Sequence, residues 1–142
     1  MQSWGDWMTT GLPHMHMVHA ACWTRNLEEA MAFWCDFLGA TAGDIYHSSR
    51  RQGFRSCFIR LPGGGTQIEL MSGPWLPEDE IADRPGWDHI AISVGGVADV
   101  DALAARCREA GNLAAEPRVT GDGYYEAIVR MPDGTPIEIV AA

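Results

Sequence analysis

Gly53-Phe-Arg-Ser-Cys-Phe-Ile-Arg-Leu-Pro62 is the stretch that decides the fold, because the chain contains it twice. It returns as Gly123-Tyr-Tyr-Glu-Ala-Ile-Val-Arg-Met-Pro132, with the first glycine, the second arginine and the final proline at matching places. After a one-residue slip in the turn, Gly65-Thr-Gln-Ile-Glu69 matches Gly134-Thr-Pro-Ile-Glu138. Self-similarity of this kind is the signature of a structural unit used more than once.

The repeat extends upstream to a histidine in each half. Val18-His19-Ala20 matches Asp88-His89-Ile90, so each half runs from a His near its start to a Glu near its end. Identical residues, an identical turn and nearly identical spacing seldom coincide by chance. The sequence therefore predicts two copies of one module.

The first half has a readable order of elements. Alternating burial predicts a strand over 17–24, and Asn26 is placed to cap a helix that Gly39 ends. The helix carries an apolar stripe at i, i+3, i+4 and i+7 spacing. Strands are expected over 54–61 and 66–71 around the turn 62–65, with a further short strand over 40–46.

The second half repeats that order. A strand is expected over 89–94, and Asp99 is placed to cap a helix that ends at Gly111. One face of this helix is apolar: Val100, Leu103, Ala104 and Cys107. Strands over 124–131 and 135–140 are expected to form a hairpin around Pro132-Asp-Gly134.

These elements predict an α+β fold of two tandem βαβββ modules. We expect a half-open, curled mixed sheet with the helices outside and a concave face for a small molecule. The expected organisation is an N-terminal extension (1–16) and a single domain (17–141). The domain comprises module 1 (about 17–72), a linker (73–86) and module 2 (about 87–141). One module alone would bury too little surface to be stable.

Composition excludes several classes of partner. Apolar residues make up 46% and charged residues 20% of the 142 residues, as in globular proteins, and the formal charge of −9 disfavours nucleic acid and anionic membranes. No apolar run is long enough to span a bilayer, and the first residues do not resemble a signal peptide, so the cytoplasm is expected. Cys22, Cys35, Cys57 and Cys107 are interpreted as small buried apolar residues.

Four side chains are candidates for chemistry. On their strands Glu69 and Glu138 lie between apolar neighbours, and His19 and His89 face away from theirs, so all four are expected on the concave face. Two carboxylates in a dry site repel each other, and a divalent cation removes that cost. Two imidazoles and two carboxylates suit Zn, Ni or Co better than Ca. The simpler alternative is two core histidines and two edge carboxylates without chemistry.

At these residues the chain resembles the vicinal oxygen chelate superfamily, the glyoxalase and bleomycin-resistance group. The resemblance covers about residues 17–141 and is carried by these motifs: Val18-His19, Phe33-Trp-Cys-Asp-Phe-Leu-Gly39, Ile68-Glu69-Leu70, Asp88-His89-Ile-Ala-Ile-Ser-Val94, Pro132-Asp-Gly134 and Ile137-Glu138. The pattern looks most like short bacterial lactoylglutathione-lyase-like proteins.

The resemblance implies a glyoxalase I-type lyase or isomerase. Its ligand order His, Glu, His, Glu matches His19, Glu69, His89 and Glu138, and it implies one divalent metal per site. Ni or Co is favoured for activity, Zn is possible, and Fe or Mn less so. The expected reaction is a 1,2-proton shift through a metal-held enediolate, on a small α-hydroxycarbonyl or a thiol hemithioacetal. Glu138 is expected to be the base and Glu69 its partner.

The chain departs from that pattern where glutathione would bind. An Arg is expected four residues after the first His, where this chain has Trp23, and an Asn four residues after the first Glu, where it has Gly73. Candidate substrate contacts are therefore Trp23, Arg55, Trp75, Tyr124 and Tyr125, with Arg25 and Arg60 as further possible anion contacts.

Other functions remain open on the same scaffold. An epimerase or an Fe(II) extradiol dioxygenase would differ in metal and oxygen dependence. A non-catalytic protein that sequesters a drug or toxin would lack the metal quartet. The resemblance also implies a homodimer, with the quartet completed either within one chain or across the subunit interface, and a small-molecule substrate.

Overall fold

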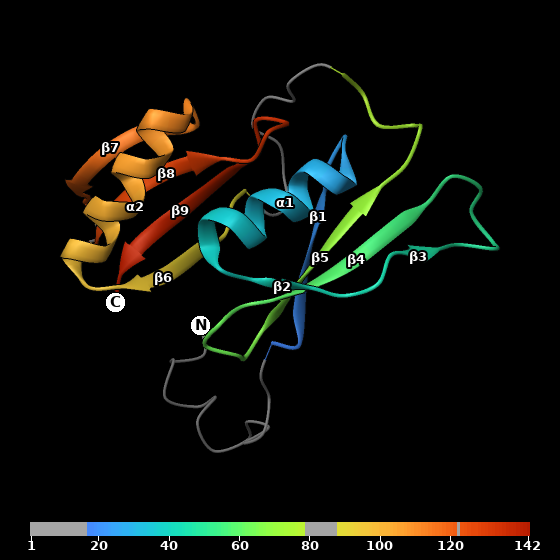
Figure 1. Ribbon diagram of the computed structural model, residues 1–142, viewed down its shortest axis with the longest axis horizontal. Helices are drawn as coiled ribbons and strands as arrows, with labels where there is room; N and C mark the ends of the chain where they lie inside the picture. The colour runs from blue at the N-terminus through green and yellow to red at the C-terminus, as the bar shows by residue number, and fades with distance from the viewer. Residues whose placement is uncertain (1–16, 79–87, 122) are drawn as a thin grey trace, which may run out of the picture.

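The chain folds into two modules that each combine one helix with one sheet (Figure 1). The computed structural model describes residues 17–78, 88–121 and 123–142. The N-terminal extension (1–16) and most of the expected linker lie outside the described residues. Among the described residues no helix is long and apolar enough to cross a bilayer.

The first module contains five strands and one helix: β1 (His19–Trp23), α1 (Leu27–Leu38), β2 (Thr41–Ala42), β3 (Tyr46–His47), β4 (Arg55–Arg60) and β5 (Gln67–Ser72). Its sheet has the order β1-β5-β4-β2, and β3 also pairs with β4. β1 runs parallel to β5, and the remaining pairs are antiparallel.

The second module repeats this topology: β6 (Ala91–Gly95), α2 (Val97–Ala110), β7 (Leu113–Val119), β8 (Tyr125–Arg130) and β9 (Pro136–Ala141). The strand order is β6-β9-β8-β7, again with one parallel pair, β6 with β9. The predicted α+β fold of two βαβββ modules is therefore confirmed.

Three of the four expected helix ends are confirmed. Asn26 caps α1 by accepting a hydrogen bond from the Glu29 N–H, and Gly39 ends the helix with φ 64°. Gly111 ends α2 with φ 82°. The prediction that Asp99 caps α2 is wrong, because the N-cap lies three residues earlier, at Gly96, and the helix begins at Val97. The Asp99 carboxylate instead reaches back and accepts the Gly96 N–H at 2.8 Å, which satisfies a helix-start donor from inside the first turn.

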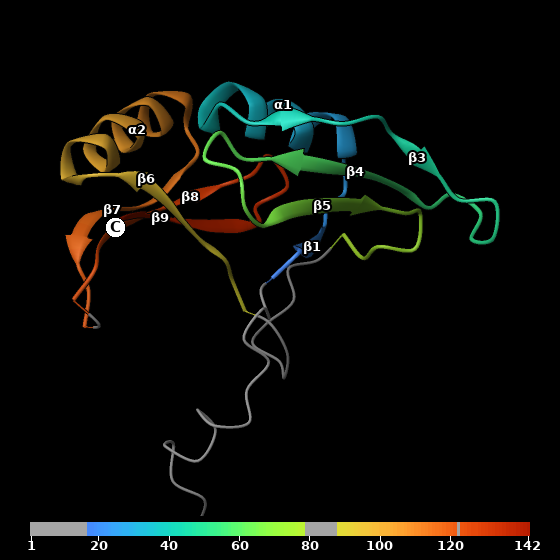
Figure 2. The ribbon, with the colours of Figure 1, turned by 90° about the horizontal axis from the view of Figure 1, so that it is seen from below.

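Both helices lie on the same side of the two sheets, which leaves the opposite faces of the sheets free (Figure 2). The core fills the space between each helix and its sheet, with Trp34, Leu27, Ile59, Leu70, Val100, Ile137 and Ile139 among its fully buried side chains. Cys57 and Cys107 are buried as expected, Cys22 and Cys35 are half-buried, and all four thiols are free.

The strands of the described residues form two open sheets that do not join into one. β1 and β6 are the inner edges of the two sheets, and each pairs with a single neighbour. Hydrogen bonds outside the two sheets hold the modules together. The Arg25 backbone N–H and guanidinium donate to Asp133 in the β8–β9 turn, Trp34 donates to Met131 at 3.2 Å, and Arg106 donates to the Asp36 carbonyl.

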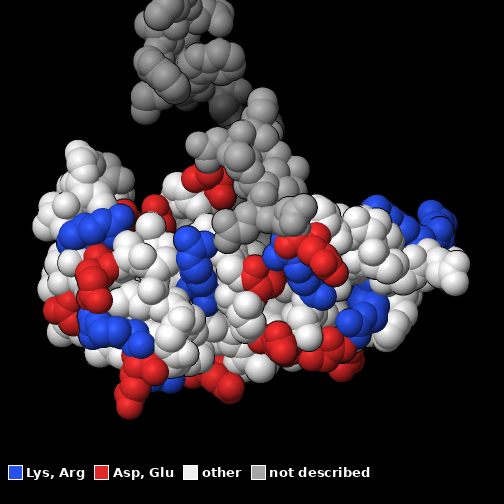
Figure 3. Space-filling model, turned by 90° about the horizontal axis from the view of Figure 1, so that it is seen from above, with Lys and Arg blue, Asp and Glu red and all other residues white. Residues whose placement is uncertain are grey.

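Acidic and basic side chains are interspersed on the face shown in Figure 3. Basic groups gather at the end of the molecule where the turn between β3 and β4 lies. The view therefore shows no broad basic surface of the kind that nucleic acid requires.

Candidate functional site

The first module places one imidazole beside one carboxylate on its free face. His19 begins β1 and Glu69 lies in the middle of β5, its parallel neighbour. Ile68 and Leu70 turn into the core, so the intervening Glu69 turns to the free face, as the alternation predicts. His19 Nε2 lies 3.6 Å from Glu69 Oε2, with the two side chains 41% and 19% exposed.

The second module forms an equivalent pair. Glu138 lies between the buried Ile137 and Ile139 on β9, and its Oε2 lies 3.2 Å from His89 Nε2. His89 does not open the strand as expected. β6 begins at Ala91, the register partner of Glu138, and His89 lies two residues before it. The pair nevertheless forms, because the segment continues the line of β6: the Ile90 carbonyl accepts the Glu138 N–H.

The neighbouring Asp88 also orients the His89 ring. Its Nδ1 lies 2.7 Å from Asp88 Oδ2, which leaves Nε2 directed to Glu138. The hydrogen bond to Asp88 raises the pKa of His89, and the charges of Glu138 and Glu126 add to this against the opposing effect of burial. A carboxylate behind a histidine is the arrangement that commonly orients metal-ligating imidazoles.

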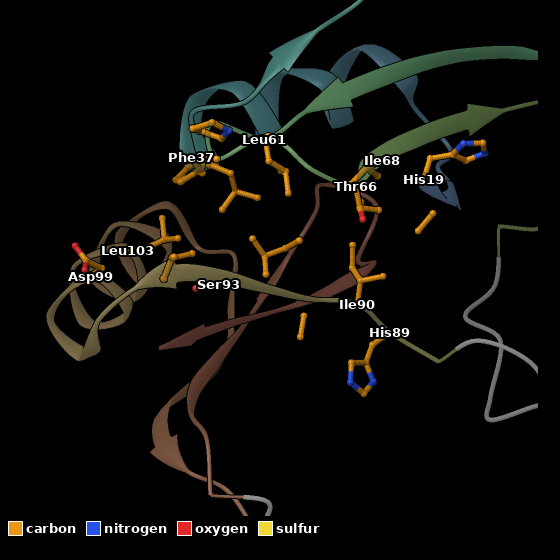
Figure 4. A pocket seen from close by; sticks show the side chains of 18 of the residues that line it. His19, Phe37, Leu61, Thr66, Ile68, His89, Ile90, Ser93, Asp99 and Leu103 are labelled. Carbon is orange, nitrogen blue, oxygen red and sulfur yellow. The ribbon is translucent and has the colours of Figure 1, made fainter. Parts of the chain in front are cut away.

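The structure brings the four predicted residues together as two pairs, not as one quartet. His19 and His89 lie on opposite sides of the gap between the modules, and their rings point away from one another (Figure 4). Within the described parts of the chain, no three His, Cys, Asp or Glu side chains form a group that could hold a metal ion.

The gap between the modules contains a cavity of about 1240 Å³. Its walls come from both inner edge strands, the C-terminal end of α1, one face of α2 and the turn after β4. They are mainly apolar: Phe37, Leu61, Ile68, Ile90, Ile92 and Leu103. His19 and His89 are at its margin (Figure 4). An apolar cavity of this size is large for one small chain and indicates a binding surface.

The donor set fits a borderline divalent ion. Each pair offers one imidazole nitrogen and one carboxylate oxygen on a free face of its sheet. Two such pairs would supply two nitrogens and two oxygens, which suits Ni, Co or Zn and leaves room for substrate oxygens. Each half alone has too few ligands for a stable site.

Two further residues on the free faces were not among the predicted site residues. Phe58 lies on β4 opposite Glu69, and its ring meets His19 edge-on at 5.2 Å between centroids. Glu126 shares the face of Glu138, since its neighbour Ile128 pairs with Glu138 across the sheet, and it is only 5% exposed. The alternation applied to Glu69 and Glu138 would have found both residues.

The predicted substrate contacts are divided between two faces. Trp23 and Trp75 meet edge-on at 5.9 Å, near the free face of the first sheet. Tyr124 precedes β8 and is 50% exposed. Arg55 and Tyr125 point the other way: Arg55 pairs with Glu28 on α1, and the Tyr125 hydroxyl donates to Asp101 on α2. Their contacts with the helices turn both side chains away from the sheet faces that carry the His–Glu pairs.

Comparison with known families gives one clear assignment. The family model described as the glyoxalase/bleomycin resistance protein/dioxygenase superfamily matches residues 16–139. A comparison with curated proteins finds no match. The matched range includes both His–Glu pairs, all of the first module and nearly all of the second.

Solved structures share the fold at low sequence identity. A glyoxalase/bleomycin resistance protein/dioxygenase domain from Frankia sp. EAN1pec is 21% identical with a TM-score of 0.77, covering 90% of this chain and 98% of that one. The trypanothione-dependent glyoxalase I of Leishmania major is 23% identical with a TM-score of 0.67, covering 89% and 86%. A lactoylglutathione lyase from Agrobacterium tumefaciens is 19% identical with a TM-score of 0.63, covering 92% and 96%.

Proposed function

Because the chain belongs to the glyoxalase/bleomycin resistance protein/dioxygenase superfamily, we propose that it is a metal-dependent lyase or isomerase of the glyoxalase type. The observation that carries the proposal is the His–Glu pair at equivalent positions of both modules, 3.6 Å and 3.2 Å apart. Members of the family typically bind a divalent metal. The ligands in this chain would be His19, Glu69, His89 and Glu138.

The two pairs would be joined by a second copy of the chain. β1 and β6 are free sheet edges, and an apolar cavity lies between them. Free edges and apolar surface are features that a subunit interface covers. In a two-fold dimer, the first-module pair of one copy would meet the second-module pair of the other, which gives two identical sites.

The chain's own residues would carry the proton shift. Glu138 would take the proton from the carbon next to the carbonyl group and return it to the adjacent carbon, with Glu69 as the second carboxylate able to do so. The divalent ion, when bound, would polarise the carbonyl oxygen and offset the charge of the enediolate. The free faces of the sheets would hold the substrate.

The test begins with metal content. The protein is stripped with a chelator, reloaded separately with Ni, Co and Zn, and analysed for bound metal, for which we expect about one ion per chain. Each form is then assayed on the hemithioacetals that methylglyoxal forms with glutathione and with a benzylic thiol. We expect turnover that disappears in Glu138→Gln and persists in Glu109→Gln, a change of an exposed glutamate on α2.

The alternatives give different results. Protein that binds no metal would contradict the proposed ligands. Stoichiometric metal without turnover of either adduct would contradict the glyoxalase reaction. Oxygen consumption with a catechol would then indicate a dioxygenase, and deuterium exchange next to a carbonyl without net isomerisation would indicate an epimerase.

A further inference from the structure

We propose that Trp23, Trp75 and Arg51 form a subsite for a flat aromatic group that carries a carboxylate. The proposal names the substrate class of the site described above and to that extent rests on the proposed function. The subsite lies on the first module, at the end of β1 opposite to His19.

The two tryptophans belong to a larger group of aromatic side chains that are exposed or half-buried. Trp23 meets Trp75 edge-on at 5.9 Å and Phe54 edge-on at 6.0 Å, and Phe54 lies 6.4 Å from Tyr46. Trp23 is 37% and Trp75 38% exposed. Large rings that are held in place by one another, yet reach solvent, provide rigid surfaces on which a flat ligand can stack.

A cation lies directly over one face of the Trp75 ring and close to the Trp23 ring. The guanidinium carbon of Arg51 is 3.6 Å from the centre of the Trp75 ring and 5.7 Å from that of Trp23. A guanidinium that stacks on a ring keeps its N–H donors around its edge, where they can bind a carboxylate in two places. Within the described parts of the chain, no carboxylate forms an ion pair with Arg51.

The position of Trp75 depends on the absence of a side chain at residue 73. A Cβ atom built on Gly73 would lie 2.3 to 2.6 Å from three atoms of the Trp75 indole. The same loop is also close to residue 53, where a Cβ atom would lie 2.7 Å from Pro74. The Trp75 indole therefore occupies the space that a side chain at residue 73 would need, so its position requires glycine there.

The subsite lies on the same face of the first sheet as His19 and Glu69, so an elongated substrate could contact both. Trp23 and His19 lie on the same face of β1, four residues apart, which is about 13 Å along a strand. Between them on that face is Ala21, whose register partner is Glu69. Because Ala21 is small and its two neighbours on that face are large, there is space above the strand between Trp23 and His19. The Phe58 ring lies beside His19.

These features select the ligand. Aromatic surfaces favour a flat ring over a flexible peptide, whose ordering on binding costs entropy. The guanidinium favours a carboxylate, and basic groups gather at this end of an otherwise acidic chain (Figure 3). The tripeptide glutathione offers charges but no ring, so its affinity for the subsite should be low.

Calorimetric titration with 2-naphthoate tests the subsite, in metal-loaded and in metal-free protein. We expect saturable binding that weakens about tenfold in Arg51→Gln, the loss of one charge-assisted contact, and about tenfold in Trp75→Ala. Trp75→Phe should restore part of the affinity, which separates loss of stacking from misfolding.

The controls vary the neighbouring arginine and the ligand. Arg50→Gln, next to Arg51 in the same turn, should bind as the unchanged protein does. Neutral 2-naphthylmethanol and non-aromatic decahydronaphthalene-2-carboxylate should both bind more weakly.

Three results would overturn the proposal: equal affinity in Arg51→Gln, equal affinity for the saturated carboxylate, or displacement of 2-naphthoate by glutathione at similar concentration. Binding that disappears with the metal and ignores Arg51→Gln would place the carboxylate on the ion, which also overturns it but leaves the proposed function standing. Protein that binds no metal yet shows the Arg51-dependent affinity would retain the subsite and contradict the proposed function.

Discussion

At the scale of single residues, Asp88 orients the neighbouring His89, one of the proposed metal ligands. Its carboxylate lies 2.7 Å from His89 Nδ1 and thereby fixes which ring nitrogen faces Glu138. We expect Asp88→Asn to weaken Zn or Ni affinity by about tenfold. Competition with a chromophoric chelator measures the affinity. Asp44→Asn, a change of an exposed aspartate, is the control, and equal affinities in the two variants would contradict the assigned role.

Gly73 is a second residue of this kind, because its lack of a side chain makes room for the Trp75 indole. In Gly73→Ala the new methyl group displaces the Trp75 indole, so we expect 2-naphthoate to bind roughly tenfold more weakly. In the double variant with Trp75→Ala, affinity should be no lower than in Trp75→Ala alone, because the indole that the new methyl group would displace is absent. Gly63→Ala is the matched control, since a Cβ there meets nothing within 4 Å. Additive losses in the double variant would show that the two residues act separately.

The sequence predicted individual residues well where alternation and the repeat agreed. Glu69 and Glu138 turn to the free faces because both neighbours of each are apolar and buried. Arg55 and Tyr125 were predicted as substrate contacts from their residue type and not from alternation, and they lie on the helix side of their strands. A long polar side chain can lie over the edge of the core and reach a helix carboxylate, as Arg55 reaches Glu28, and periodicity alone does not reveal such a partner.

At the scale of elements, the contact between the β1–α1 loop and the β8–β9 turn predicts how stability depends on pH. Asp133 lies at this contact. Burial raises the pKa of Asp133, but hydrogen bonds from Thr24, Thr135 and the Arg25 backbone outweigh it, so the net pKa lies below its ordinary value. A carboxyl group with a lowered pKa stabilises the folded state fully above its unfolded pKa. The contribution is lost as the pH falls through the folded pKa.

We therefore expect Asp133→Asn to lower the free energy of unfolding by about 1 kcal/mol at pH 7, a value reduced for its partial exposure. The difference from the unchanged protein should shrink as the pH falls below about 4, where the unfolded carboxyl group begins to be protonated. Urea unfolding at pH 7 and at successively lower pH measures both effects. Asp36→Asn, at an exposed aspartate, should show neither, and a constant difference at every pH would contradict the assignment.

Most elements could be predicted from sequence because each carries a local signal. The caps at Asn26 and Gly39 and the apolar stripes of both helices are such signals. The start of α2 was misplaced because Asp99 is an equally good residue for the cap and for the third helical position, where it bonds back to Gly96. The weak strand expected over 40–46 forms as two two-residue strands, β2 and β3, which depend on pairing with β4.

At the scale of the whole molecule, sequence could not predict how the two modules are placed. Periodicity shows which face of a strand is buried, but it does not show which sheet edges meet. The residues expected in one concave site consequently form two His–Glu pairs on separate sheets, and among the described strands β1 and β6 each have only one neighbour. If the proposed quartet is completed across two chains, it depends on contacts outside one chain, for which one sequence holds no local signal.

Complementation between two inactive variants tests that arrangement directly. One variant, His19→Ala/Glu69→Ala, lacks the first-module pair, and the other, His89→Ala/Glu138→Ala, lacks the second-module pair. Neither homodimer has a complete site if each site uses two chains. In a mixed dimer, one site combines both damaged pairs and the other combines both intact pairs. Unfolding and refolding an equal mixture should therefore restore roughly a quarter of the metal sites of the unchanged protein, measured as bound Ni per chain. If each chain closes its own quartet, mixing restores nothing, and the sites belong to single subunits.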